Sequence, residues 1–256
     1  MPDFLIVGAQ RSGTTSLYRY LTQHPDVLPA LEKEVHFFDL QHHRGYEWYA
    51  SRFCPAPIRG RRYITGEASP YYLFHPRVPA LVRAALPDVR LIVILRDPAE
   101  RALSHYAHSV RQGFEALPLA EALAREPERL AGEAERMVAD AGYNSFSHQH
   151  HSYLARGHYA EQLRCWQALF PAEQLRVLRF EDLRERPAAL MAEVCGFLGL
   201  REHQFDLRVR HNEGTPAVVD AGVRHMLRER YCEPNRELER LVGCALGWPT
   251  GEEGAP

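Results

Sequence analysis

The first 16 residues constrain the fold more than any other stretch of this chain. A short apolar run, Phe4-Leu5-Ile6-Val7, leads directly into Gly8-Ala9-Gln10-Arg11-Ser12-Gly13-Thr14-Thr15-Ser16, and an amphipathic segment follows. This pattern predicts a buried strand, then a glycine-bounded loop, then a helix that begins near Thr14. Such a loop turns backbone N–H groups toward one point, and the start of the helix adds the positive end of its dipole. We therefore expect a binding site for an anion, most often phosphate.

The loop differs from the phosphate loop of ATPases and GTPases at one position. Its glycines, Gly8 and Gly13, have the P-loop spacing, but Thr14 stands where those proteins have lysine. The nearest positive charge is Arg11, which lies earlier in the loop. The residues expected to hold a phosphate-like group are Arg11, Ser12, Gly13, Thr14, Thr15 and Ser16.

A second buried strand carries an arginine at its carboxyl end. The aliphatic run Leu91-Ile92-Val93-Ile94-Leu95 is typical of a parallel sheet that is covered on both faces. Arg96 follows it, and Asp97-Pro98-Ala99-Glu100 then has the pattern of a helix N-cap, a first helical residue and a capping box. Open α/β sheets bind ligands at this end of their strands, so Arg96 is a candidate ligand contact. The alternative is a surface arginine that pairs with Asp97.

The remaining pattern indicates one α/β domain. Further strands are expected at 27–28, 63–70 and 175–180, and helices near 14–23, 78–86, 159–170, 187–198, 223–231 and 235–246. Residues 115–137 have the composition of a helical insertion, with breaks at Pro118 and Pro127. We expect a P-loop-like three-layer fold in which helices flank a central parallel sheet. A single domain should cover residues 1–250, with 251–256 as a flexible tail.

Composition narrows the class of protein further. The chain has 256 residues, of which 45% are hydrophobic and 25% are charged, and this is ordinary for a soluble globular protein. Its formal net charge of −2 argues against binding to nucleic acid or to a membrane surface. No apolar run reaches the ~20 residues of a membrane span, and the first strand begins too early for a signal peptide. We therefore expect a cytoplasmic enzyme and make no prediction about its oligomeric state.

The cysteines and histidines do not predict a metal site. The five cysteines are far apart and form no C-x-x-C pair, so we expect reduced thiols. The segment His148-Gln149-His150-His151 has three histidines, but no carboxylate nearby in the sequence completes a ligand set. A solvated loop or the start of a helix is the preferred interpretation of this segment.

A dense cluster of ionisable side chains occurs at Lys33-Glu34-Val35-His36-Phe37-Phe38-Asp39. If this segment is extended, Glu34 and His36 are two residues apart and face the same side. Either can accept a proton, and Asp39 can orient one of them. The alternative is a half-buried loop whose charges are solvated. Glu67, in the strand expected at 63–70, is a further candidate, although a structural role fits it equally well.

Three of these blocks together resemble the sulfotransferases that use PAPS (3′-phosphoadenosine 5′-phosphosulfate). The block from Phe4 to Thr15 resembles their 5′-phosphosulfate loop. The block from Leu91 to Ser104 resembles their 3′-phosphate site, with Arg96 and Ser104 in the matching positions. The Lys33–Asp39 segment resembles the heparan sulfate branch, both the 3-O- and the N-sulfotransferases, in which the first glutamate is the proposed base.

The chain departs from that branch at several places. Arg11 stands where most members have lysine, and Ala68 stands where some have lysine. The disulfide-bearing hairpin of the 3-O enzymes is missing, and the expected absence of a Golgi anchor fits a soluble, bacterial-type member. In place of a lysine-rich loop the chain has Arg210-His211-Asn212-Glu213-Gly214, and the nucleotide contacts expected there are His211, Asn212 and Gly214.

The resemblance implies a reaction in which a sulfuryl group moves from PAPS to a hydroxyl or amine of a carbohydrate or small molecule. The product PAP (3′-phosphoadenosine 5′-phosphate) is released, and no metal is required. Glu34 would be the general base, with His36 the second candidate; Arg11 would face the leaving phosphate, and Arg96 and Ser104 would hold the 3′-phosphate. The candidate acceptor contacts are Asp39, Arg44, Trp48, Glu67, Tyr71 and Tyr72. Two alternatives stay open, a P-loop nucleotide kinase and a non-catalytic protein that binds PAP or another nucleotide.

Overall fold

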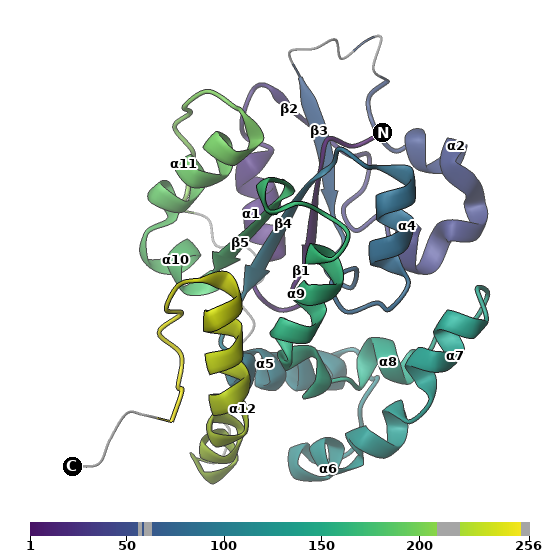
Figure 1. The fold of residues 1–256 in the computed structure, drawn as a ribbon, viewed down its shortest axis with the longest axis vertical. Helices are drawn as coiled ribbons and strands as arrows, with labels where there is room; N and C mark the ends of the chain where they lie inside the picture. The colour runs from purple at the N-terminus through teal and green to yellow at the C-terminus, as the bar shows by residue number, and fades with distance from the viewer. Residues whose placement is uncertain (56–57, 59–62, 209–220, 252–256) are drawn as a thin grey trace. The chain divides into compact units, whose positions relative to one another are not determined.

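The computed structural model describes residues 1–55, 58, 63–208 and 221–251 (Figure 1). Contacts divide this part of the chain into two compact units. One contains Met1–Leu95 and residues 166–208, and the other contains Arg96–Cys165 and residues 221–251. A single domain over residues 1–250 stays a prediction, and residues 252–256 of the expected tail lie outside the described residues.

The first unit is built on a five-stranded sheet of order β2-β3-β1-β4-β5, in which neighbouring strands pair in parallel. The strands are β1 (Phe4–Gly8), β2 (Val27–Pro29), β3 (Ile64–Ala68), β4 (Arg90–Leu95) and β5 (Leu175–Arg179). Each of them overlaps a stretch where the sequence predicts a strand. The predicted fold class, a central parallel sheet flanked by helices, is therefore confirmed.

Two crossover helices cover the two faces of this sheet. Helix α1 (Thr14–Leu21) connects β1 to β2, and helix α4 (Val78–Ala85) connects β3 to β4 (Figure 1). The two connections run in opposite directions across the strand order. Since such crossovers are almost always right-handed, α1 and α4 lie on opposite faces. This explains why the central strands are apolar on both sides.

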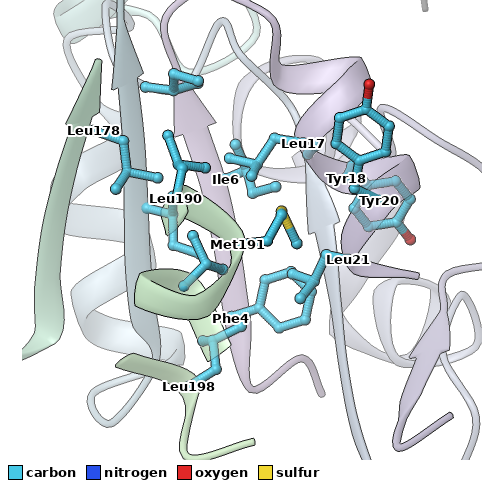
Figure 2. Close-up of a cluster of buried hydrophobic side chains, with 14 of the residues drawn as sticks. Phe4, Ile6, Leu17, Tyr18, Tyr20, Leu21, Leu178, Leu190, Met191 and Leu198 are labelled. Atoms are coloured by element: carbon cyan, nitrogen blue, oxygen red, sulfur yellow. The ribbon is translucent and has the colours of Figure 1, made fainter. Parts of the chain in front are cut away.

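The core under α1 fixes the position of the loop that precedes it. Figure 2 shows Leu17 of α1 meeting Leu190 and Met191 of α11 (Pro187–Leu198) over Ile6 of β1. At most 3% of each of these side chains is exposed, and full burial of such a side chain stabilises the fold by about 1.5–3 kcal/mol. The other helices of this unit are η1 (Phe37–Gln41), η2 (His42–Arg44), α2 (Gly45–Ala50), η4 (Ala172–Gln174) and α10 (Phe180–Glu185).

The second unit is helical in the part that the structure describes. Its helices are α5 (Pro98–Arg111), α6 (Leu119–Leu130), α7 (Glu133–Ala139), α8 (Phe146–His150), η3 (Ala155–Gly157) and α12 (Ala221–Val242), and α9 (Tyr159–Gln167) carries the chain back to the first unit. Leu103, Tyr153, Leu227 and Tyr231 belong to its buried core.

Two predictions about proline in this unit are wrong. Pro127 lies inside α6 and Pro234 inside α12, so neither breaks its helix, and α12 is one helix where the sequence predicts two. Proline inside a helix costs about 3 kcal/mol. In α12, Tyr231 and Leu238 are both buried on either side of the proline, so their packing holds the helix together.

The histidine segment is neither a solvated loop nor the start of a helix, because it forms the last part of α8 (Phe146–His150) and the residue after it. His148 lies in α8 with 4% of its surface exposed. Ser145 caps this helix, because its hydroxyl accepts the His148 N–H at 3.0 Å. The segment is therefore part of the packing of the second unit.

Candidate active site

The loop between β1 and α1 is fixed at both of its ends. The N–H of Ala9 donates to the carbonyl of Ile94 in β4 at 2.7 Å. Helix α1 begins at Thr14, and Gly13 before it has a left-handed φ of 88°. A Cβ at position 13 would also lie 2.8 Å from the ring of Phe180. Both facts require glycine there, since other residues are strained at this φ.

The same loop contains a buried hydroxyl for which the described residues supply no partner. Ser12 is fully buried, and its Oγ makes no hydrogen bond within the described structure. The first turn of α1 adds N–H groups for which a helix has no carbonyl. An unsatisfied buried hydroxyl costs about 1–3 kcal/mol. The donors of this junction, which holds all the predicted loop residues from Arg11 to Ser16, therefore fit a phosphate or phosphosulfate group.

Glu34, His36 and Asp39 form one linked cluster. The Nδ1 atom of His36 lies 2.7 Å from Asp39 Oδ2, and its Nε2 atom lies 3.4 Å from Glu34 Oε2. The ammonium of Lys33 contacts the other oxygen of Glu34. The Asp39 side chain contacts His36 and is fully buried. It therefore presents no surface to an acceptor.

The backbone of this cluster is not extended, so the alternation of side chains considered for an extended segment does not apply. Glu34 and His36 have left-handed φ values of 59° and 51°. Few residues other than glycine adopt this conformation, and those that do gather at functional sites. The turn brings both side chains together although the chain does not alternate there as a strand does.

The cluster gives Glu34 and His36 opposite protonation behaviour. Burial alone would raise the pKa of the Glu34 carboxyl, but the hydrogen bond to His36 and the charge of Lys33 outweigh it and lower the pKa to about 2. Burial alone would lower the pKa of His36, but its hydrogen bonds to Asp39 and Glu34 raise it to about 10. At neutral pH, Glu34 is a carboxylate that can accept a proton, whereas His36 is an imidazolium that cannot. His36 is therefore not in the state of a general base.

Three of the candidate acceptor contacts lie inside the protein. Glu67 and Tyr72 are fully buried, and Tyr71 is 3% exposed. Glu67 accepts hydrogen bonds from the hydroxyls of Tyr49 at 2.7 Å, Ser69 at 2.6 Å and Tyr72 at 3.0 Å. Since these groups expose no surface to an acceptor, we no longer assign that role to Glu67, Tyr71 or Tyr72. The sequence did not identify Ser69 as part of this group. The only signal for it is that its hydroxyl lies two residues after the Glu67 carboxylate.

Two other candidate acceptor contacts lie at the surface. The Arg44 guanidinium stands 4.3 Å from the centroid of the Trp48 ring, and Arg52 stands 5.0 Å from it. Arg44 is exposed and Trp48 is partly exposed. Arg52, which the sequence did not single out, also pairs with Glu32 at 3.5 Å. Two cations beside one aromatic ring can contact an anionic or sugar ligand.

Arg96 and Ser104 lie in the second unit. Arg96 directly follows β4 along the chain, and its carbonyl accepts a hydrogen bond from the Tyr159 hydroxyl at 2.9 Å. Asp97 caps α5 by accepting the Glu100 N–H at 3.0 Å, as the capping pattern predicts. The side chains of Arg96 and Ser104 are both partly exposed.

Three predicted nucleotide contacts, His211, Asn212 and Gly214, lie outside the described residues. Within the described ranges, no group of three or more His, Cys, Asp or Glu side chains is placed to hold a metal ion. A search of the same ranges finds no helix that is long and apolar enough to cross a membrane.

Fold and loop together define the class of this protein: an α/β protein of P-loop-like topology with a glycine-bounded loop where a central strand turns into a helix. The family model described as "Sulfotransferase domain" matches residues 1–213. The chain therefore belongs to the sulfotransferase family, and the resemblance drawn from its motifs is confirmed.

Known proteins of this family match nearly the whole chain. A sulfotransferase from Alicyclobacillus acidocaldarius with a crystal structure is 31% identical, with a TM-score of 0.77 over 96% of this chain and 97% of that one. Heparan sulfate glucosamine 3-O-sulfotransferase 6 of Homo sapiens is 30% identical over 96% of this chain and 73% of its own length. The 3B1 enzyme of the same type from Mus musculus is 29% identical over 97% of this chain. The chain spans about two thirds of the length of curated relatives such as this one.

Proposed function

We propose that the protein transfers a sulfuryl group from PAPS to a hydroxyl or amine of a saccharide or small-molecule acceptor. The observation that carries the proposal is a combination within the first unit. A glycine-bounded loop leads into the start of α1, where the first N–H groups have no helical partner, and it occurs together with a partly exposed, ionised carboxylate at Glu34. Membership of the sulfotransferase family supports the same reaction.

The loop would stabilise the charge that develops on the leaving group. As the bond between sulfur and the bridging oxygen breaks, negative charge grows on the 5′-phosphate of PAP. In this proposal, the N–H groups at the start of α1 and the guanidinium of Arg11 would contact the phosphate and stabilise that charge. Preorganised donors of this kind are commonly worth a factor of about 10²–10³ each in turnover.

Glu34 would accept the proton of the acceptor hydroxyl as the new S–O bond forms. Its pKa of about 2 keeps it ionised over the physiological range but makes it a weak base. We therefore expect it to hydrogen-bond the hydroxyl first and to take the proton late in the transfer. His36, held protonated between Glu34 and Asp39, would orient the carboxylate.

Arg96 and Ser104 would bind the 3′-phosphate, a group that PAPS has and ATP lacks. The planar guanidinium of Arg96 can bind two phosphate oxygens at once. The hydroxyl of Ser104, about two turns into α5, adds a further donor. No metal is needed in this scheme, because loop donors and arginines neutralise both phosphates.

The proposed acceptor is a sugar hydroxyl or amine. The matched curated proteins include heparan sulfate glucosamine 3-O-sulfotransferases and a bifunctional heparan sulfate N-deacetylase/N-sulfotransferase, so both chemistries occur among relatives. Arg44 and Trp48 are exposed features of the kind that contact sugars and their anionic groups. The proposed place of action is the cytoplasm, as expected from the sequence.

The test uses PAPS carrying labelled sulfur and a panel of neutral and sulfated saccharides. Transfer of label to any member, together with calorimetric binding of PAP that is tighter than that of ATP, is the expected result. Tighter binding of ATP would favour a kinase. PAP binding without transfer to any acceptor would favour a non-catalytic protein, and a lack of PAP binding would overturn the proposal.

A further inference from the structure

The proposed reaction does not use the buried carboxylate of Glu67. This group is linked by hydrogen bonds to the catalytic segment, which runs from Lys33 to Asp39. Glu67 is fully buried near the end of β3 and accepts hydrogen bonds from Tyr49, Ser69 and Tyr72. Three hydroxyl donors on one carboxyl group match an ionised carboxylate, which can only accept. The direction of all three hydroxyls is therefore set by Glu67.

Two of these hydroxyls also hold the backbone of the catalytic segment. The Oγ of Ser69 accepts the N–H of His36 at 3.1 Å. The hydroxyl oxygen of Tyr72 accepts the N–H groups of Phe37 at 2.8 Å and Phe38 at 3.3 Å. Each bond continues through the hydroxyl hydrogen to the buried carboxylate, and bonds in such chains strengthen one another.

These contacts act as the N-terminal cap of η1. The first N–H groups of a helix have no carbonyl of their own, and His36, the residue at the cap position, provides no side-chain cap. Ser69 and Tyr72 supply the missing acceptors from a distant part of the chain. Left-handed φ values such as those of Glu34 and His36 persist only where surrounding contacts impose them.

We propose that Glu67 is a positioning residue, which through Ser69 and Tyr72 holds residues 36–38 so that Glu34 and His36 keep the conformation in which they act. The inference rests on the proposed function for its catalytic consequence. Its structural part concerns the conformation of the segment and stands without any activity.

Tyr49 provides a matched control for Tyr72. Both tyrosines are fully buried, and both donate to Glu67. Of the two hydroxyls, only that of Tyr72 accepts backbone N–H groups of the catalytic segment within the part of the chain that the structure describes. Phenylalanine at either position removes one hydroxyl and keeps the ring contacts, which are Tyr49 with Phe37 at 4.4 Å and Tyr72 with Phe38 at 5.7 Å between centroids.

The experiment compares Tyr72→Phe with Tyr49→Phe by turnover, by PAP affinity and by the pKa of His36 from NMR titration. We expect Tyr72→Phe to lower kcat by ~10- to 100-fold, because small misplacement of catalytic groups has effects of this size. PAP affinity should not change, and the pKa of His36 should fall from about 10 toward 6.5 as its carboxylate contacts loosen. Tyr49→Phe should leave kcat and the pKa of His36 near their wild-type values.

Two further variants keep the proposal falsifiable. Glu67→Gln places an amide N–H₂ against a hydroxyl donor and should shift kcat and the pKa of His36 in the same direction as Tyr72→Phe. If Tyr72→Phe does not fold, Ser69→Ala removes the acceptor of the His36 N–H instead. Equal effects of the two tyrosine variants, or an unchanged His36 pKa in Tyr72→Phe, would overturn the inference. If the wild-type protein transfers no sulfuryl group, the proposed function fails, and the pKa comparison still decides on the positioning role.

Discussion

His36 lies between the carboxylates of Asp39 and Glu34, so its charge is coupled to the folded conformation of the segment around it. Burial opposes that charge, but the two hydrogen bonds outweigh burial and raise its pKa from 6.5 to about 10. A group whose pKa is raised by folding stabilises the folded state fully below its ordinary pKa. That contribution is lost as the pH rises from 6.5 to about 10.

Comparison with His36→Asn tests this coupling. Asparagine tolerates the left-handed backbone and does not titrate, so the variant keeps the turn and loses the charge. We expect the wild-type protein to be more stable than the variant below pH 6.5, and the difference to shrink as the pH approaches 10. Urea unfolding at both ends of this range measures it, and a difference that does not depend on pH would contradict the account.

Residue types in the site could be read from the sequence, whereas their conformation could not. Glu34, His36 and Asp39 were identified by their chemistry and spacing. Their left-handed turn was missed, because glycine, asparagine and aspartate are the residues that signal a positive φ. The hydrogen bond from the His36 N–H to Ser69 spans 33 residues, and no local pattern records such a contact.

At the scale of elements, the junction between β1 and α1 depends on one glycine. Gly13 has a left-handed φ of 88°, and a Cβ there would lie 2.8 Å from the Phe180 ring. Gly132, which precedes α7, has a similar left-handed conformation with a φ of 73°, but nothing lies within 4 Å of the position of a Cβ. The pair therefore separates the effect of backbone strain from the effect of crowding.

We expect Gly13→Ala to destabilise the protein more than Gly132→Ala, because both glycines are left-handed but only Gly13 is crowded. The excess should be about 1–3 kcal/mol, the usual cost of overpacking a filled site. The same change should weaken PAP binding, because α1 and the loop must shift to relieve the contact with Phe180. Urea unfolding and calorimetry measure the two effects, and equal losses for both variants would show that crowding is not important at position 13.

Elements with a strong local pattern were predicted well, whereas the helices that contain proline were not. Strands β1 and β4 fall on continuous apolar runs, which local pattern alone identifies. The cap of α5 at Asp97 was predicted because its signal is also local. Pro127 and Pro234 misled the prediction, since packing of side chains elsewhere in each helix outweighs the penalty of proline.

For the molecule as a whole, binding of the proposed product PAP should increase the free energy of unfolding. A ligand that binds only the folded state adds about 2.7 kcal/mol to the free energy of unfolding at 100 times its Kd. We expect PAP to raise the Tm in this way and ATP at the same concentration to raise it less, because ATP has no 3′-phosphate for Arg96 and Ser104. Thermal unfolding measures this shift, and an equal or larger shift with ATP would contradict the donor assignment.

The α/β class was predictable at this scale, but the two compact units were not. Buried aliphatic strands that alternate with helices are sufficient for the class. Within the described residues, the chain passes from one unit to the other directly after β4 and again within α9. No stretch rich in glycine, serine or proline marks either passage, so composition gives no boundary.

The central claim is that Glu34 acts as the base of sulfuryl transfer, and one comparison tests it most directly. Glu34→Gln removes the proton acceptor, whereas Glu32→Gln removes an exposed carboxylate two residues away that pairs only with Arg52 in the described ion pairs. The measurement is the rate of labelled sulfuryl transfer from PAPS to the best acceptor, with PAP affinity measured in parallel. The account predicts a loss of ~100-fold or more for Glu34→Gln with PAP affinity retained, and a rate near wild type for Glu32→Gln. Equal rates for the two variants would contradict it.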